Sequence, residues 1–365
     1  MQLEIDDLIF GYLFVCTLLI AFNIVYIFYS AWNRKQIEKE TVKWVGIIEP
    51  KIQNIDNSLV GRDHLSMVQK KTQNTDGLLA YSRALERVHC EEAKKRKYYE
   101  QCAEVYQRIV SEYAKKDSMD RAFAAYFISK NCPYYGDEYH QLYDLLLSYF
   151  DDSSVYCREN VLRALYACGN VQAVYNMLSR MEEHHIFHHR KLIADGLITF
   201  KGDKKALADM LWSHMDMFGE NMQIAVINFI TATQEDYGEA FMQALHKKHQ
   251  SIEITLSLIR YYRRHYYEPI LPLLYDYMNS DVDNSISIVV AGVLTKYPTE
   301  ETREVLRNSI HHSNWYVRLN SATSLVEMSI NDEDAEAIIE SGDIYAMEML
   351  RYVLEEKNGE AEADA

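Results

Sequence analysis

The chain of 365 residues is poor in the two residues that interrupt helices, with 13 glycines and 5 prolines. Such a composition leaves little of the turn chemistry that a many-stranded β protein or a glycine-rich phosphate-binding fold needs. Hydrophobic residues make up 48% of the chain and charged residues 25%, which is enough apolar material for a large core or a stack of small units. An all-α fold is therefore expected.

Cysteine is also sparse, and its six copies are scattered without a CxxC pair or a close cluster. This usage is typical of free thiols in a reducing compartment, so neither a disulfide framework nor a zinc site is predicted. The sequence contains no GxGxxG, GxxxxGK[ST], GxSxG or HExxH pattern. No catalytic residue, cofactor site or metal site is predicted, and the chain is not expected to be an enzyme.

Positive charge is scarce in the C-terminal two thirds of the chain. The formal net charge is −16, and residues 117–365 carry 21 bases against 39 acids, whereas residues 34–116 carry 17 bases against 12 acids. Binding to DNA or RNA depends on Lys and Arg that neutralise phosphates. A nucleic acid partner is therefore not expected.

One long segment lacks charge altogether. It begins at Leu8 and ends at Tyr29, which is about the length that spans a hydrocarbon core of roughly 30 Å as a helix. Tyr26, Tyr29 and Trp32 resemble an interfacial aromatic belt, and Arg34 follows at once. By the positive-inside rule, we expect a single pass through the cell membrane, with a short N-terminus outside and the rest of the chain in the cytoplasm.

A cleavable signal peptide is the alternative interpretation of this segment. Such a peptide should have a basic N-terminal region and an apolar run of roughly 7 to 15 residues. Here the N-terminus is acidic and the apolar run is longer. Residues 1–33 are therefore predicted to be an uncleaved transmembrane anchor.

Residues 34–116 are predicted to form a basic helical stem with a hinge. The apolar helix should continue from Arg34 and end before Pro50, because the residue before a proline is pushed out of the α region. Residues 51–77 are polar and are interpreted as a hinge or a loosely ordered stem. Residues 91–114 have apolar side chains at three- and four-residue spacing and should form one amphipathic helix.

A repeated pattern occupies the remainder of the chain. Counted from Val317, residues 317–325 have a base at +1, small residues at +4, +5 and +7, and an apolar residue at +8. Six earlier copies of this frame, some lacking the base or the small residues, begin 31 to 37 residues apart, at Asp120, Cys157, His189, Met222, Ile254 and Ile286. Helix-pair repeats have this period. The partner helices are expected at 138–150, 171–181, 205–215, 237–246, 269–278 and 301–310.

The frame resembles the VRxxAAxAL helix of the HEAT repeat family, an armadillo-like group. The resemblance covers residues 117–355 and implies a right-handed α-solenoid of helix pairs, with the motif helices on its concave side. In the family the base at +1 often pairs with an acid six residues earlier, and only Arg158 has one here, Asp152. Residues 356–365 are acidic and are predicted to be a disordered tail.

Two features are candidates for partner binding. Residues 260–267 form a basic and aromatic island, in which Arg260 at +6 should point away from the core while Tyr261 and Tyr262 at +7 and +8 should lie in it. Tyr and Arg are enriched at binding hot spots. Trp315 is interpreted as a plug between repeats or as an exposed anchor, with the plug favoured. The candidate partner-binding residues are Arg260, Arg263, Arg264, Tyr267 and Trp315.

A histidine cluster is the candidate for a metal. If the segment were helical, His184 with His188 and His185 with His189 would be i,i+4 pairs that could chelate zinc. The cluster has no third ligand at recognisable spacing and lies between two predicted helices. A solvated connector is therefore the favoured interpretation.

Repeats and an anchor together predict a membrane-anchored cytoplasmic scaffold or regulator that binds a protein partner, itself membrane-associated. A membrane enzyme such as a polysaccharide glycosyltransferase is one guess at that partner, by analogy alone. The resemblance also implies an alternative, a HEAT-like cofactor-handling enzyme of the bilin lyase type, which would need a ligand pocket in the groove. Neither the number of complete repeats nor the oligomeric state follows from the sequence.

Overall fold

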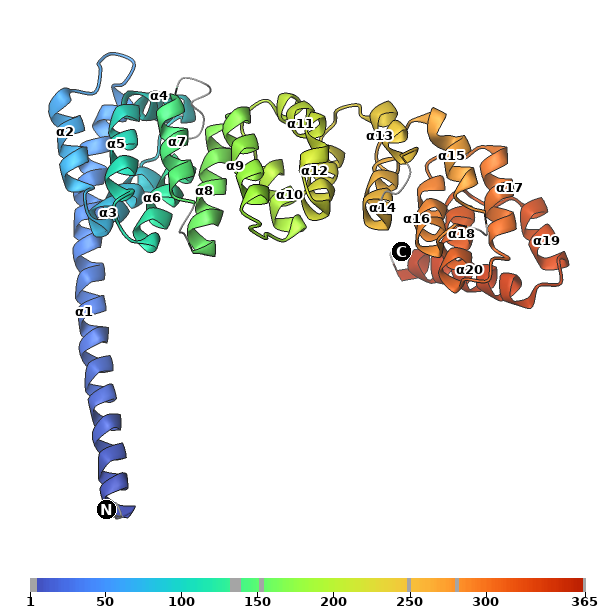
Figure 1. Ribbon diagram of the computed structural model, residues 1–365, viewed down its shortest axis with the longest axis horizontal. Coiled ribbons are helices and arrows are strands. Elements are labelled where there is room, and N and C mark those ends of the chain that lie inside the picture. Colours follow the sequence, from blue (N-terminus) through green and yellow to red (C-terminus); the bar gives the residue numbers. More distant parts are fainter. Residues whose placement is uncertain (1–4, 132–138, 151–153, 248–250, 280–281, 364–365) are drawn as a thin grey trace. The chain divides into compact units, whose positions relative to one another are not determined.

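The computed structural model describes residues 5–131, 139–150, 154–247, 251–279 and 282–363 (Figure 1). Within these ranges the regular structure is helical and contains no strand, which confirms the all-α prediction. The chain divides into two compact units. Unit 1 comprises Met1–Met177 with Thr199–Asp203, and unit 2 comprises Leu178–Ile198 with Lys204–Ala365.

The helices of unit 1 are α1 (Ile5–Gln53), α2 (Arg62–Lys71), α3 (Thr75–Arg87), α4 (Glu92–Gln101), α5 (Ala103–Tyr113), α6 (Ser118–Asn131), α7 (His140–Ser148) and α8 (Val155–Cys168). Helix α9 (Val171–Glu183) begins in unit 1 and ends in unit 2. The α-helices of unit 2 are α10 (Arg190–Ile198), α11 (Lys204–Ser213), α12 (Glu220–Ala232), α13 (Gly238–Leu245), α14 (Ile252–Tyr261), α15 (Leu271–Asp276), α16 (Asn284–Leu294), α17 (Glu300–Ser309), α18 (Trp315–Glu327), α19 (Asp332–Glu340) and α20 (Ile344–Ala363).

Helix α1 has two halves with different surroundings. Its large apolar side chains from Phe10 to Tyr29 are exposed, and this part extends beyond the other helices of unit 1 (Figure 1). The second half buries Trp44, Ile48 and Ile52, and it packs on α3 and α4. By length and composition α1 is able to cross a membrane, a test that a signal sequence also satisfies.

Residues 51–77, predicted to be a hinge or a loosely ordered stem, are largely helical. Helix α1 continues through Pro50 to Gln53, and the polar segment contains all of α2 and the start of α3. The Asn74 side chain begins α3 by accepting a hydrogen bond from the Gly77 amide at 2.7 Å, and Val68 and Leu78 are fully buried. The polar composition therefore belongs to the solvated faces of short helices.

The single helix expected at residues 91–114 is divided at Cys102 into α4 and α5. Its apolar face is nevertheless correct, because the side chains at the predicted spacing, Tyr98, Cys102, Val105, Ile109 and Tyr113, are all buried. The spacing therefore predicted the buried face correctly but missed the break.

Motif helices and partner helices alternate as the repeat frame predicts. The seven frame starts fall at or beside the first turns of α6, α8, α10, α12, α14, α16 and α18, and the expected partner helices correspond to α7, α9, α11, α13, α15 and α17. In unit 2, α10, α12, α14, α16, α18 and α20 pack on one another in succession. Helices α11, α13, α17 and α19 each pack on the helix that follows in the chain. A right-handed solenoid remains a prediction.

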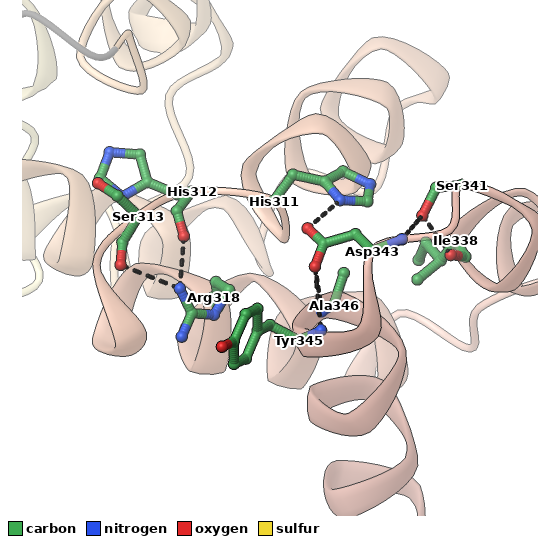
Figure 2. Close-up of polar contacts among 9 residues, drawn as sticks. All are labelled: His311, His312, Ser313, Arg318, Ile338, Ser341, Asp343, Tyr345 and Ala346. Atoms are coloured by element: carbon green, nitrogen blue, oxygen red, sulfur yellow. Dashed lines mark hydrogen bonds and ion pairs between the residues drawn. The ribbon is translucent and has the colours of Figure 1, made fainter.

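The bases at +1 find partners other than the expected acid. Arg318 donates hydrogen bonds to the carbonyl oxygens of His312 and Ser313, at 2.7 and 3.0 Å (Figure 2). Arg190 forms an ion pair with Glu253 at 3.0 Å. The pairing predicted between Arg158 and Asp152 involves residue 152, which lies outside the described residues.

The predicted disorder of residues 356–365 stays a prediction. Helix α20 continues to Ala363. Residues 364 and 365 lie outside the described residues.

Replacing Ala322 by phenylalanine should lower the melting temperature of the chain far more than Thr323→Phe. Ala322 at +5 of α18 is fully buried, whereas Thr323 at +6 is half-buried. Overpacking a filled core costs about 1 to 3 kcal/mol. Hydrogen exchange should show faster opening after about residue 284 and little change around Cys157, because stacked helix pairs couple mainly to their neighbours. Equal sensitivity at both positions would contradict the frame.

Candidate binding groove

A groove of about 730 Å³ crosses the motif helices of unit 2. Residues from α10, α12, α14, α16 and α18, with the segments that flank α10 and α14, line it. The lining residues are His189, Arg190, Lys191, Ala194, Asp195, Ile198, Asn228, Thr231, Ala232, Arg260, Arg263, Arg264, Ile288, Val289, Gly292, Val293 and Asn320.

The repeat frame explains why these residues face one groove. Asp195, Asn228, Arg260 and Gly292 all stand at +6 of their copies, and all four line the groove. Parallel copies of one helix in one orientation present the same frame position on the same side. The expectation that Arg260 at +6 points away from the core is confirmed, since its side chain is exposed and lines the groove.

Four of the groove's cations have no acidic partner. Lys191, Arg260, Arg263 and Arg264 are exposed, and none of them forms an ion pair with a carboxylate in the described ranges. Arg190 is neutralised by Glu253, and Asp195 is the one acid among the lining residues given above. The groove therefore carries unneutralised positive charge in the acidic part of the chain.

Helix α14 gives part of the reason for these arginines. It ends at Tyr261, so Arg263 and Arg264 follow its C-terminus, where cations complement the helix dipole by about 0.3 to 1 kcal/mol. Interaction with the helix end needs one such cation and does not require arginine. The segment has three arginines within five residues, and all three line the same groove. The helix end alone does not account for this number of cations.

Part of the groove's lining, which we name the floor, is apolar and open. Ile288, Val289 and Val293 of α16 line it together with Ile198 of α10. A Cβ added at Gly292 would meet nothing within 4 Å, so the glycine leaves empty space between these side chains. The groove thus combines basic side chains, which we name its walls, with the apolar side chains of the floor.

Two buried tyrosines fix the segment that carries the arginines. The Tyr237 amide donates to the Tyr261 hydroxyl at 2.9 Å, and the Tyr262 hydroxyl donates to the Gly238 carbonyl at 2.7 Å. Burial raises the pKa of both tyrosines. Their predicted place in the core is confirmed, and they tie the end of α14 to the start of α13.

Comparison of the sequence with protein families and with curated proteins finds no match. No family model matches the chain, and no curated protein sequence matches it. The HEAT resemblance therefore rests on the repeat frame, and the function is argued from the groove and the N-terminal helix.

Tyr267 does not line the groove. Its ring lies so close to Gly238 that a Cβ added there would approach within 2.6 Å, and its amide donates to the Tyr297 hydroxyl at 3.2 Å. Tyr267 is therefore a packing residue in the structure, although it is half-buried. Its suggested role in partner binding stays a prediction that the geometry does not favour.

Trp315 is exposed, so the favoured plug interpretation is wrong. The indole is 47% exposed and meets Tyr316 edge-on, with 4.9 Å between ring centroids. Asn314 begins α18 by accepting hydrogen bonds from the Tyr316 and Val317 amides, which leaves Trp315 in the first turn. It does not line the groove, and the structure does not bring it together with the arginines.

The histidine cluster does not form the helical pairs that a chelate requires. Helix α9 ends at Glu183, and His185 has a positive φ of 51°, which places it in a turn. No group of three or more His, Cys, Asp or Glu residues that could hold a metal is found in the described ranges. His189 instead lies at the edge of the basic groove.

Sequence reasoning missed Lys191, Asn228 and Asn320 as groove residues. Asn320 donates from its side-chain amide to the Ile288 carbonyl at 2.7 Å and so joins α18 to α16. Asn228 could have been found, because it occupies the same +6 position as Arg260. Lys191 and Asn320 stand at other frame positions, and only the packing of neighbouring helices places them beside the groove.

Proposed function

We propose that this chain is a non-enzymatic scaffold, anchored in the cell membrane by α1, that binds a protein partner through the groove of unit 2. The N-terminus of α1 lies outside and both units lie in the cytoplasm, as the basic residues after the apolar run indicate. The partner is membrane-associated, and a membrane enzyme is one such class.

Helix α1 supports the anchoring part of the proposal. Its exposed apolar half is suited to lipid, and its second half belongs to the core of unit 1. The exposed apolar half and the packed half belong to one continuous helix, so the proposed anchor and unit 1 share one element.

The single observation that carries the binding part is the set of unpaired cations in the groove. Exposed arginines without acidic partners gain little for folding, whereas arginine beside apolar surface is typical of protein contact sites. The bilin lyase alternative would also use such cations, to face the carboxylates of a tetrapyrrole. That alternative predicts a purified protein that retains a chromophore absorbing visible light.

Purification of the full chain in mild detergent, from the cells that naturally produce it, tests this proposal. We expect the chain in the membrane fraction, with a protein partner recovered in stoichiometric amount. A chain without residues 1–33 should move to the soluble fraction. Recovery of no stoichiometric protein would overturn the scaffold, and a bound chromophore would favour the alternative.

A further inference from the structure

We infer that the groove of unit 2 binds an acidic amphipathic segment of the partner protein. Carboxylates of the segment pair with Arg260, Arg263, Arg264 and Lys191, and its apolar side chains lie on the floor formed by α16. This inference rests on the proposed function and names the chemistry of the part of the partner that enters the groove.

The positive charge of the arginines and the lysine that line the groove favours the binding of carboxylates. Arginine presents planar donors that match a carboxylate with two parallel hydrogen bonds, and charge-assisted bonds of this kind are roughly twice as strong as neutral ones. Arg260 lies in the last turn of α14, and Arg263 and Arg264 follow its end, so the three guanidinium groups come from one short segment. The three guanidinium groups can therefore bind several carboxylates of one peptide at the same time.

The floor distinguishes an amphipathic peptide from a purely anionic ligand. Ile198, Ile288 and Val289 keep accessible apolar surface, and the space beside Gly292 admits an apolar side chain. A volume of about 730 Å³ lies in the range of roughly 300 to 1,000 Å³ for sites that enclose small ligands. Such a site accepts a short segment rather than a folded domain.

Nucleic acid fits the groove less well than an acidic peptide does. A polyphosphate chain continues beyond any single groove and would meet the surrounding acids, which number 39 against 21 bases over residues 117–365. Sustained phosphate binding needs a long basic stripe. The four cations without acidic partners line one short groove rather than a long stripe, and Asp195 stands among them.

A photo-crosslinker inside the groove tests the inference. We would place p-benzoylphenylalanine at position 228 in place of Asn228, which is exposed and lines the groove, in the full chain within its native membranes. After irradiation, mass spectrometry identifies the attached peptide. We expect a segment of the co-purified partner that is rich in Asp and Glu with apolar residues interspersed.

Three further variants separate charge, floor and fold. Arg260→Glu should lower the crosslink yield at least about tenfold, which corresponds to about 1.4 kcal/mol. Gly292→Trp should lower it to a similar extent without changing the charge, because the indole fills the open floor. Arg351→Glu is the matched control, since Arg351 is exposed on α20 and does not line the groove, and it should leave the yield unchanged.

The outcomes distinguish this inference from the proposed function. A partner that co-purifies but crosslinks through a neutral or basic segment, or crosslinks equally in Arg260→Glu and Arg351→Glu, would overturn the inference and leave the scaffold intact. A crosslinked nucleic acid would overturn it as well. Absence of any stoichiometric partner would overturn the scaffold first. A melting temperature of Arg260→Glu close to that of the native chain shows that a loss of yield is not unfolding.

Discussion

Replacing Trp44 by alanine should lower the free energy of unfolding of unit 1 by about 3 to 5 kcal/mol, the usual range for deleting a buried aromatic side chain. Trp44 is 4% exposed, although it belongs to the same helix as the exposed apolar run. Its ring meets Tyr81 of α3 edge-on at 5.0 Å between centroids and lies 6.3 Å from the ring of His64 on α2. Deletion would leave a cavity among three helices.

Hydrogen exchange on the full chain in detergent measures this effect. Peptides from α3 and α4 should exchange at least about a hundredfold faster in Trp44→Ala, because 3 kcal/mol is about two factors of ten. Trp32→Ala is the matched control: the same residue type on the same helix, but 58% exposed. Its effect on unit 1 should stay within about 0.5 kcal/mol. Equal effects of the two variants would show that the second half of α1 is not part of the core.

This result would also bear on how the anchor works. A hinge at residues 51–77 would let unit 1 turn freely beneath the membrane. Because α1 continues from its apolar half into the core, a tilt of the proposed anchor would be transmitted to α3 and α4, on which α1 packs. In the proposed membrane-anchored arrangement, the link between membrane and unit 1 is therefore a packed helix rather than a flexible stem.

The sequence predicted those features that depend on local periodicity. Small residues such as Ala322 and apolar residues such as Leu325 recur in the frame because motif helices must approach one another, and both side chains are fully buried. That pattern is sufficient to locate the helices from α6 to α18. It also placed Arg260 on the exposed face and Tyr261 in the core.

Features that depend on distant contacts could not be predicted in this way. Residues 51–77 resemble a linker in composition, yet α2 and α3 are stabilised by side chains such as His64 and Tyr81 that pack on α1. The close approach of Tyr267 to Gly238 joins residues 29 positions apart. Lys191 enters the groove because α10 and α14 line the same space, which no single window of sequence reveals.

The stability of unit 1 should fall as the pH is lowered from about 6.5 to about 4, owing to His64. This side chain is 4% exposed, and its Nε2 lies 2.7 Å from the hydroxyl oxygen of Tyr98. The Tyr98 hydroxyl in turn lies 3.0 Å from that of Tyr81, which lies 3.2 Å from that of Tyr106. Burial lowers the pKa of His64 to about 4, and the nearby charge of Lys51 acts in the same direction.

The direction of this pH dependence follows from the number of protons that the folded and unfolded chains bind. Above pH 6.5 His64 is neutral in both the folded and the unfolded chain, so it contributes no pH dependence. Between 6.5 and 4 the unfolded chain binds the proton and the folded chain does not, and the free energy of unfolding falls. A difference of about 2.5 units in pKa corresponds to a loss on the order of 3 kcal/mol. Below pH 4 both states are protonated, and this contribution becomes constant.

His64→Gln removes the titration while keeping a polar side chain beside Tyr98. The free energy of unfolding of unit 1, followed by hydrogen exchange in α2, α3 and α4 after correction for the intrinsic pH dependence of exchange, should therefore lose most of its slope between pH 6.5 and 4. His89→Gln is the matched control, because His89 is exposed on the same unit and its removal should leave the slope in place. Equal slopes in the native chain and His64→Gln would show that His64 takes up its proton without unfolding. In that case the hydroxyls of Tyr81, Tyr98 and Tyr106 must accommodate a charged imidazole in the core.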